Sequence, residues 1–131
     1  MKVGTEWLVD ASGCASRLLS DRSVVQRICD EIIRDLDLHV IGAPAFHQFP
    51  EPGGLTVFYM LTESHLACHT YPEAAIATFN LYCCRERPDW PWAQRLGDML
   101  EAKDVTVKTL RRGDASNTKT PALSEGSGAN L

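Results

Sequence analysis

The sequence predicts an α+β fold, in which an antiparallel sheet carries two helices on one of its faces. Two stretches repeat apolar residues with the period of a helix, and six others have the composition of strands, in the order β-α-β-β-β-β-α-β. The 131 residues suffice for one hydrophobic core. We expect one domain at residues 1–112, and a disordered tail at residues 113–131, which are rich in Ser, Gly, Asn and Thr.

The first strand is expected at residues 5–10, and the turn-prone residues 11–13 end it. The first helix is the clearest element, because its apolar residues recur with helical spacing. This stripe consists of Val24, Val25, Ile28, Cys29, Ile32, Ile33 and Leu36. Ser20 or Asp21 is expected to cap the helix, and Cys29 is expected to belong to the core.

Extended segments follow, interrupted by a loop of Pro and Gly at residues 50–54. These segments are residues 38–49, 55–62, 65–71 and 75–84. Asp89 is expected to cap a second helix, with Pro91 in its first turn. The apolar stripe of that helix consists of Trp92, Ala93, Leu96, Met99 and Leu100. Residues 105–110 read as the last strand.

Alternation along the strands predicts which sheet face is buried. Phe79, Leu81 and Cys83 share one side of their strand, and Leu66 and Cys68 share one side of the preceding strand. The opposite face should carry His69, Tyr71, Asn80, Tyr82 and Cys84. Such a face is a solvated surface, or a site that a second subunit covers.

Composition excludes several classes of protein. With 13 Lys and Arg against 17 Asp and Glu, the net charge of −4 argues against nucleic-acid binding. No apolar stretch approaches the roughly 18 residues that span a membrane, and no signal peptide is recognisable. The number of cysteines, five, is odd, whereas a secreted disulfide framework has an even number, and the sequence contains no CxxC pair. We therefore expect a cytoplasmic protein with free thiols.

A cluster of Cys and His residues between positions 65 and 84 leaves several interpretations open. A metal site is disfavoured, because on a strand His65 and His69 would lie roughly 13 Å apart. Cys84 and His69 could form a nucleophilic pair, in which the imidazole lowers the pKa of the thiol. Two unrelated polar residues on one strand face are the simpler alternative.

Residues 63–73, ESHLACHTYPE, closely resemble the ESHxxxHTxPE signature of the prokaryotic S-adenosylmethionine decarboxylase proenzymes. The resemblance includes Gly4, the FHQF of residues 46–49, and Cys84, and covers roughly residues 4–112. It implies a self-processing, pyruvoyl-dependent decarboxylase of S-adenosylmethionine, which supplies the aminopropyl donor for spermidine biosynthesis. It also implies a homodimer of αβ protomers, whose sheets form a four-layer α/β/β/α sandwich.

The family's self-processing assigns roles to four residues. By resemblance, the hydroxyl of Ser64 attacks the carbonyl carbon of Glu63, and the ester that results eliminates to leave a pyruvoyl group made from Ser64. His69 matches the histidine that assists processing. Thr56 stands where the family usually has a serine that helps maturation.

The resemblance also assigns the residues that act on substrate. The substrate amine would form a Schiff base with the pyruvoyl group, and Cys84 matches the acid that protonates the decarboxylated carbon. Phe49 and Tyr71 match two aromatic positions that hold adenine between them. Glu73 matches the carboxylate that binds the ribose hydroxyls.

The sequence also departs from the family pattern. No histidine follows Gly4, Asn80 stands where Asp is common, and the loop at residues 50–55 is slightly longer than usual. These departures keep an alternative substrate open, namely ornithine or arginine. An unprocessed homologue that serves as a regulatory binding partner is a further alternative.

Overall fold

The computed structural model describes residues 3–115 and 117–123. The strands are β1 (Gly4–Ser12), β2 (Ala45–Gln48), β3 (Leu55–Leu61), β4 (Ser64–Tyr71), β5 (Ile76–Cys83) and β6 (Asp104–Arg112). The helices are α1 (Ser16–Leu19), α2 (Arg22–Asp35) and α3 (Trp92–Leu100), together with the 3₁₀ turn η1 (Pro72–Ala74).

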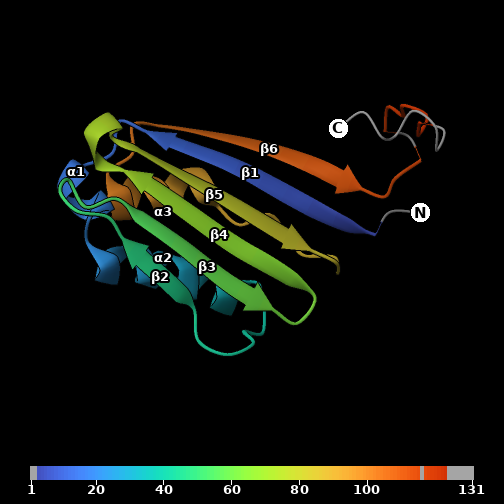
Figure 1. The fold of residues 1–131 in the computed structure, drawn as a ribbon, viewed down its shortest axis with the longest axis horizontal. Helices are drawn as coiled ribbons and strands as arrows, with labels where there is room; N and C mark the ends of the chain where they lie inside the picture. Colours follow the sequence, from blue (N-terminus) through green and yellow to red (C-terminus); the bar gives the residue numbers. More distant parts are fainter. Residues whose placement is uncertain (1–2, 116, 124–131) are drawn as a thin grey trace.

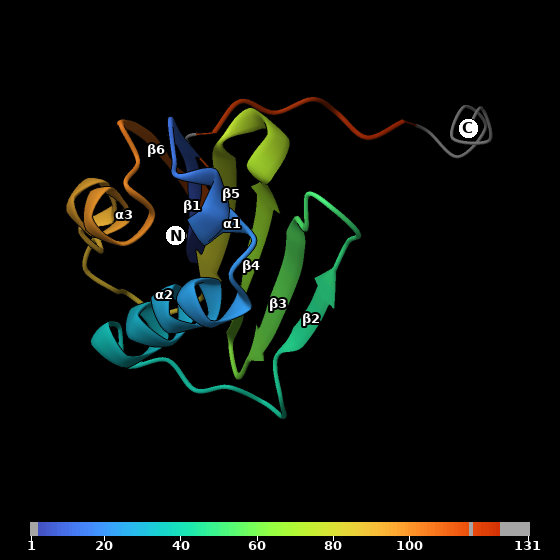
Figure 2. The ribbon, with the colours of Figure 1, turned by 90° about the vertical axis from the view of Figure 1, so that its left-hand side faces the viewer.

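The six strands form one antiparallel sheet in the order β2-β3-β4-β5-β1-β6 (Figure 1). Figure 2 shows α2 and α3 on the same side of this sheet. The α+β class and the placement of both long helices on one face are therefore confirmed. The opposite side, which we call the open face, carries no helix in the described part of the chain.

The helix α2 begins where the sequence predicted. The carboxylate of Asp21 accepts hydrogen bonds from the backbone amides of Ser23 and Val24, at 3.0 and 3.3 Å, so Asp21 and not Ser20 is the cap. The side chains that α2 buries are Val25, Ile28, Cys29 and Ile32. Cys29 is fully buried, as predicted, and burial raises the pKa of its thiol.

The start of α3 differs from the prediction. The helix begins at Trp92, with Pro91 as the residue before its first turn, and no side chain caps it. Asp89 is not a cap, because its carboxylate accepts a hydrogen bond from the indole of Trp7 at 3.0 Å. Ala93, predicted in the apolar stripe, is exposed. Tertiary contact with Trp7 outweighs the local capping preference of Asp89.

Two other segments also differ. The helix α1 was not predicted, because its four residues are too short to reveal a period. Of the extended segment at residues 38–49, only Ala45–Gln48 joins the sheet, apart from an isolated bridge at Val40. Gly42, at φ 73°, turns the chain between the two.

Residues 113–115 and 117–123 contain no helix or strand. The disorder predicted for residues 113–131 stays a prediction, and residues 116 and 124–131 lie outside the described residues. In the described part of the chain, no helix is both long and apolar enough to cross a membrane.

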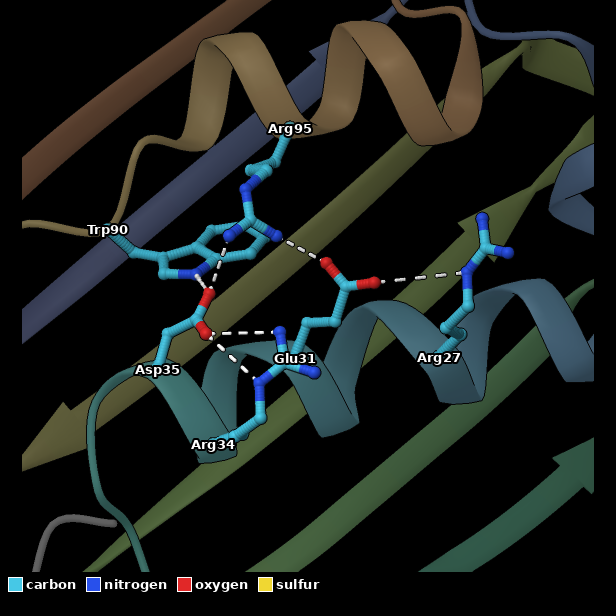
Figure 3. Close-up of polar contacts among 6 residues, drawn as sticks. All are labelled: Arg27, Glu31, Arg34, Asp35, Trp90 and Arg95. Carbon is cyan, nitrogen blue, oxygen red and sulfur yellow. Dashed lines mark hydrogen bonds and ion pairs between the residues drawn. The ribbon is translucent and has the colours of Figure 1, made fainter.

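A polar cluster joins α2 to α3 (Figure 3). Arg95 of α3 pairs with Glu31 and, at 2.7 Å, with Asp35 of α2. Asp35 also accepts a hydrogen bond from the indole of Trp90 at 3.0 Å, and this bond is the main cause of its lowered pKa. The cluster holds the two helices side by side on the core side of the sheet.

The two faces of the sheet alternate in burial as predicted. Leu66, Cys68, Phe79 and Leu81 are buried against the helices. The open face carries the side chains between them, together with the large apolar residues Phe58 and Met60, which are 43% and 51% exposed.

Candidate active site

The bond between Glu63 and Ser64 lies at a tight hairpin turn. Leu61 pairs with Ser64, so only two residues connect β3 to β4. Ser64 is half-buried and pairs across the sheet with Cys83 of β5. The hydroxyl of Ser64 is hydrogen-bonded to the Cys83 thiol, whose pKa burial raises to about 11.

A hollow of about 100 Å³ opens beside this turn, and we call it the Ser64 hollow. It brings together Glu63, Ser64 and Cys84, three of the predicted site residues. The other residues that line it are Asp37, Leu38, His39, Thr62, Cys83, Arg85 and Arg87. Cys84 directly follows β5 and is exposed, in contrast to the buried Cys83.

A second hollow, of about 500 Å³, contains the remaining predicted residues, and we call it the His69 hollow. It contains Phe49, Thr56, His69, Tyr71 and Glu73. The other residues that line it are Pro50, Glu51, Pro52, Gly54, Leu55 and Thr70.

Within the His69 hollow, cross-strand pairing sets the position of the imidazole. His69 lies opposite Thr56, and its Nδ1 is 3.4 Å from the threonine Oγ1. The rings of Phe49 and Tyr71 are 52% and 42% exposed, which leaves aromatic surface for a flat ligand.

Thr70 supports this hollow, and sequence reasoning gave it no role. Its buried hydroxyl donates to the carbonyl of Leu19 at 2.7 Å and accepts from the amide of Leu55 at 2.9 Å. The loop also approaches β4 so closely that a Cβ on Gly54 would lie 2.7 Å from the Thr70 carbonyl oxygen. In the sequence, the only indication of a role for Thr70 was its place in the signature, directly after His69.

The two hollows lie at opposite ends of the β3–β4 hairpin. Ser64 and His69 are five residues apart on one strand, which corresponds to roughly 17 Å. Their side chains also alternate to different faces of the sheet. The predicted pair of Cys84 and His69 therefore does not form within one chain. Parity assigned the side chains to faces but could not give the register of β4 against β5, which places Cys83 opposite Ser64 and Thr78 opposite His69.

The predicted polar face is accordingly divided, and its middle is a separate network. The amide of Asn80 donates to Glu6 at 2.8 Å and accepts a hydrogen bond from His65 Nε2 at 3.0 Å. Glu6 also pairs with Arg112 at 2.7 Å, and its pKa is lowered, mainly by the bond from Asn80. Among the described residues, no group of three or more His, Cys, Asp or Glu side chains could hold a metal ion.

Comparison with known proteins decides the family. A family model described as S-adenosylmethionine decarboxylase matches residues 5–113. The chain belongs to this family. Similar S-adenosylmethionine decarboxylase proenzymes include those of Clostridium tetani and Acetivibrio thermocellus. Both are 30% identical over 112 residues, which cover 85% of this chain and 87% and 89% of theirs.

The fold of this S-adenosylmethionine decarboxylase family member is also that of a solved structure. The adenosylmethionine decarboxylase of Aquifex aeolicus matches with a TM-score of 0.72 at 21% identity. The match covers 92% of this chain and 98% of that chain. The structure also links two of the departures noted above. The side chain of Asn80 donates a hydrogen bond to Glu6, which lies in the segment Gly4-Thr5-Glu6-Trp7 that lacks the usual histidine.

Proposed function

We propose that this chain is a proenzyme that cleaves itself between Glu63 and Ser64 and then decarboxylates S-adenosylmethionine, giving the aminopropyl donor for spermidine biosynthesis. One observation carries the proposal: Ser64 opens β4 directly after a two-residue turn, in the hollow that also contains Cys84. The membership of the family supports it, since the curated relatives are named proenzymes.

Self-cleavage uses the hydroxyl of Ser64. Its Oγ bonds to the carbonyl carbon of Glu63 as the carbon–nitrogen bond breaks, and the hydroxyl proton passes to the nitrogen. Loss of the Ser64 α-proton then breaks the Cβ–Oγ bond and releases Glu63 as a carboxylate. Water replaces the nitrogen, which leaves as ammonia. The products are a chain of residues 1–63 and a chain of residues 64–131, whose N-terminus is a pyruvoyl group.

The Ser64 hollow fits this group, because a pyruvoyl group occupies no more space than the serine from which it forms. The group supplies a ketone next to an amide carbonyl, which accepts the electrons that the departing carboxylate leaves behind. Cys84 is the acid that returns a proton to the substrate carbon, since its thiol is exposed on the rim of the hollow. Cys83 is unsuited to that task because its thiol is buried and hydrogen-bonded to the hydroxyl of Ser64.

The His69 hollow binds the nucleoside part of the substrate. Phe49 and Tyr71 present exposed rings for the adenine, and Glu73 accepts hydrogen bonds from the ribose hydroxyls. A volume of about 500 Å³ suits a ligand of this size. Ornithine and arginine have neither an aromatic base nor a diol. We expect kcat/KM for S-adenosylmethionine to exceed that for either amino acid by about 10⁴-fold, and a processed enzyme that prefers a basic amino acid would contradict the proposal.

Two protomers complete each site. His69 must lie about 3 Å from a proton that it moves, yet it is roughly 17 Å from Ser64 on its own strand. We infer that two open faces pack together with their strands in opposite directions, which brings the His69 hollow of one protomer to the end of the sheet where the Ser64 hollow of the other lies, so that His69 reaches that hollow around the β3–β4 turn. The exposed Phe58, Met60 and Leu110 support this packing. The dimer is the four-layer α/β/β/α sandwich.

Mass spectrometry of the purified chain tests the cleavage. The expected result is two fragments, residues 1–63 and residues 64–131, the second with a pyruvoyl group at its N-terminus. One intact chain contradicts the proposal and favours the unprocessed regulatory homologue.

Co-expression of two impaired variants tests the shared site. Cys84→Ala damages one hollow and Glu73→Ala the other, and neither removes Ser64. If each site uses both protomers, random pairing restores about a quarter of the sites. If each site lies within one protomer, the mixture is no more active than the average of the separate variants.

A further inference from the structure

The Ser64 hollow contains two arginines that the proposed cleavage and decarboxylation do not use. Nε of Arg85 lies 2.6 Å from Oε1 of Glu63, the residue before the cleaved bond. Arg87 lines the same hollow and donates to the carbonyl of Asp37 at 3.3 Å. Its Nε is buried and has no hydrogen-bond partner within residues 3–115 and 117–123.

Cleavage changes the charge at this place. In the uncut chain, Glu63 carries only its side-chain carboxylate. Elimination at Ser64 converts its carbonyl into an α-carboxylate, which is ionised at neutral pH because such groups have pKa values of about 3.5. Residue 63 then carries two negative charges and has lost its covalent tie to β4.

We propose that Arg85 and Arg87 form a binding site for this new C-terminal carboxylate. The inference rests on the cleavage between Glu63 and Ser64 proposed above. Arg85 positions Glu63 before cleavage by holding its side chain. After cleavage, the two guanidinium groups hold the α-carboxylate, for which the unpartnered Nε of Arg87 provides a donor.

The position of the two arginines in the chain indicates what the carboxylate site would do. Both arginines follow Cys84 within three residues, on the segment between β5 and α3, so one segment carries the acid and the anchor. The anchored end of residues 1–63 stays at the hollow, next to the group made from Ser64. The site therefore stops the cut end of residues 1–63 from leaving the hollow after cleavage.

A solvated surface pair is the alternative, because Arg85 and Glu63 are 67% and 45% exposed. A matched control is available in Arg17, which pairs with Glu101 at 2.8 Å with 70% and 55% exposure. Arg17 belongs to α1, which packs near η1 at the other end of β4.

The experiment follows freshly synthesised chain and then mature enzyme, for wild type, Arg85→Gln, Arg85→Lys and Arg17→Gln. Gel or mass analysis gives the rate of cleavage, and carboxypeptidase digestion gives the rate at which Glu63 is released from residues 1–63. We expect Arg85→Gln to cleave several-fold more slowly and to release Glu63 several-fold faster. Arg85→Lys should be intermediate, because it keeps the charge, and Arg17→Gln should match wild type.

Salt gives a readout that a purely structural role would not change. Raising the ionic strength from about 0.05 to about 0.5 M should speed release of Glu63 more in wild type than in Arg85→Gln, where only Arg87 remains, because screening weakens exposed ion pairs. Wild-type chain that stays intact overturns the proposed function itself. Cleaved wild type with unchanged cleavage and unchanged Glu63 release in both Arg85 variants overturns only the carboxylate site.

Discussion

The Ser64 hollow and the His69 hollow differ in size, lining and construction. The first is about 100 Å³ and is built from a turn and the segment after β5, with charged residues around it. The second is about 500 Å³ and is built from a Pro- and Gly-rich loop that Thr70 holds against β4. A small, charged hollow suits a reaction of the chain on itself, whereas a wide one with exposed rings suits a ligand that enters and leaves.

The comparison also separates two kinds of mutation. Changes in the Ser64 hollow should affect bond making and breaking, and changes in the His69 hollow should affect the binding of substrate. His69 and Thr56 are the exception, because the proposed dimer places them beside the Ser64 hollow of the other protomer. The following predictions test this division.

The largest effect is expected for Ser64→Ala. Without a hydroxyl there is no nucleophile and no source of the pyruvoyl group, so we predict an intact chain without decarboxylase activity. Intact mass and release of carbon dioxide from S-adenosylmethionine measure the two losses. Ser20→Ala, which removes an exposed hydroxyl bonded to the Arg17 carbonyl, should cleave normally. Normal cleavage of Ser64→Ala would refute the mechanism.

Cys84→Ala should separate cleavage from turnover. We predict that the chain still cleaves, while kcat falls by about 10²- to 10⁴-fold through loss of the acid. Single-turnover measurements on cleaved protein test this, with Cys14→Ala near η1 as the control. If the cleaved variant keeps full activity, Cys84 is not the acid, and Tyr82 on the open face becomes the next candidate.

Glu73→Gln should act on the other hollow only. Replacing the carboxylate weakens a charge-assisted bond to the ribose, worth about 1.5–3 kcal/mol, so we predict a loss of roughly 10- to 100-fold in kcat/KM for S-adenosylmethionine. Cleavage should proceed at the wild-type rate. Glu101→Gln, which changes an exposed carboxylate that pairs with Arg17 and lines neither hollow, is the control. Slowed cleavage in Glu73→Gln would show that the two hollows are not separable in this way.

The smallest effect is expected for Thr56→Val. The change keeps the shape of the side chain but removes the hydroxyl 3.4 Å from His69 Nδ1, so we predict cleavage a few-fold slower, by the roughly 1 kcal/mol of one hydrogen bond. Thr56→Ser should restore the rate. A time course of cleavage for both variants measures this, and equal rates for valine and threonine would remove Thr56 from the processing machinery.

Local patterns predicted much of the sheet and of both long helices. Val25, Ile28 and Ile32 recur with a spacing that places them on one face only if the segment is a helix. The carboxylate of Asp21 accepts hydrogen bonds from the backbone amides that follow it directly in the sequence, so its role as a cap is visible locally. Asp89 shows where such reasoning fails, since its carboxylate accepts a hydrogen bond from the indole of Trp7, 82 residues away in the sequence, and does not cap the helix. The four residues of α1 are too few for a period to be visible.

The sequence by itself determined the family and the identity of the candidate residues, because the ESHLACHTYPE signature is a property of contiguous residues. It also determined which side chains share a sheet face, since alternation follows from the backbone of a strand. Only the tertiary structure decided that these residues form two separate hollows at opposite ends of one hairpin. Strand length and register set that separation, and both depend on pairing between segments that are distant in the chain.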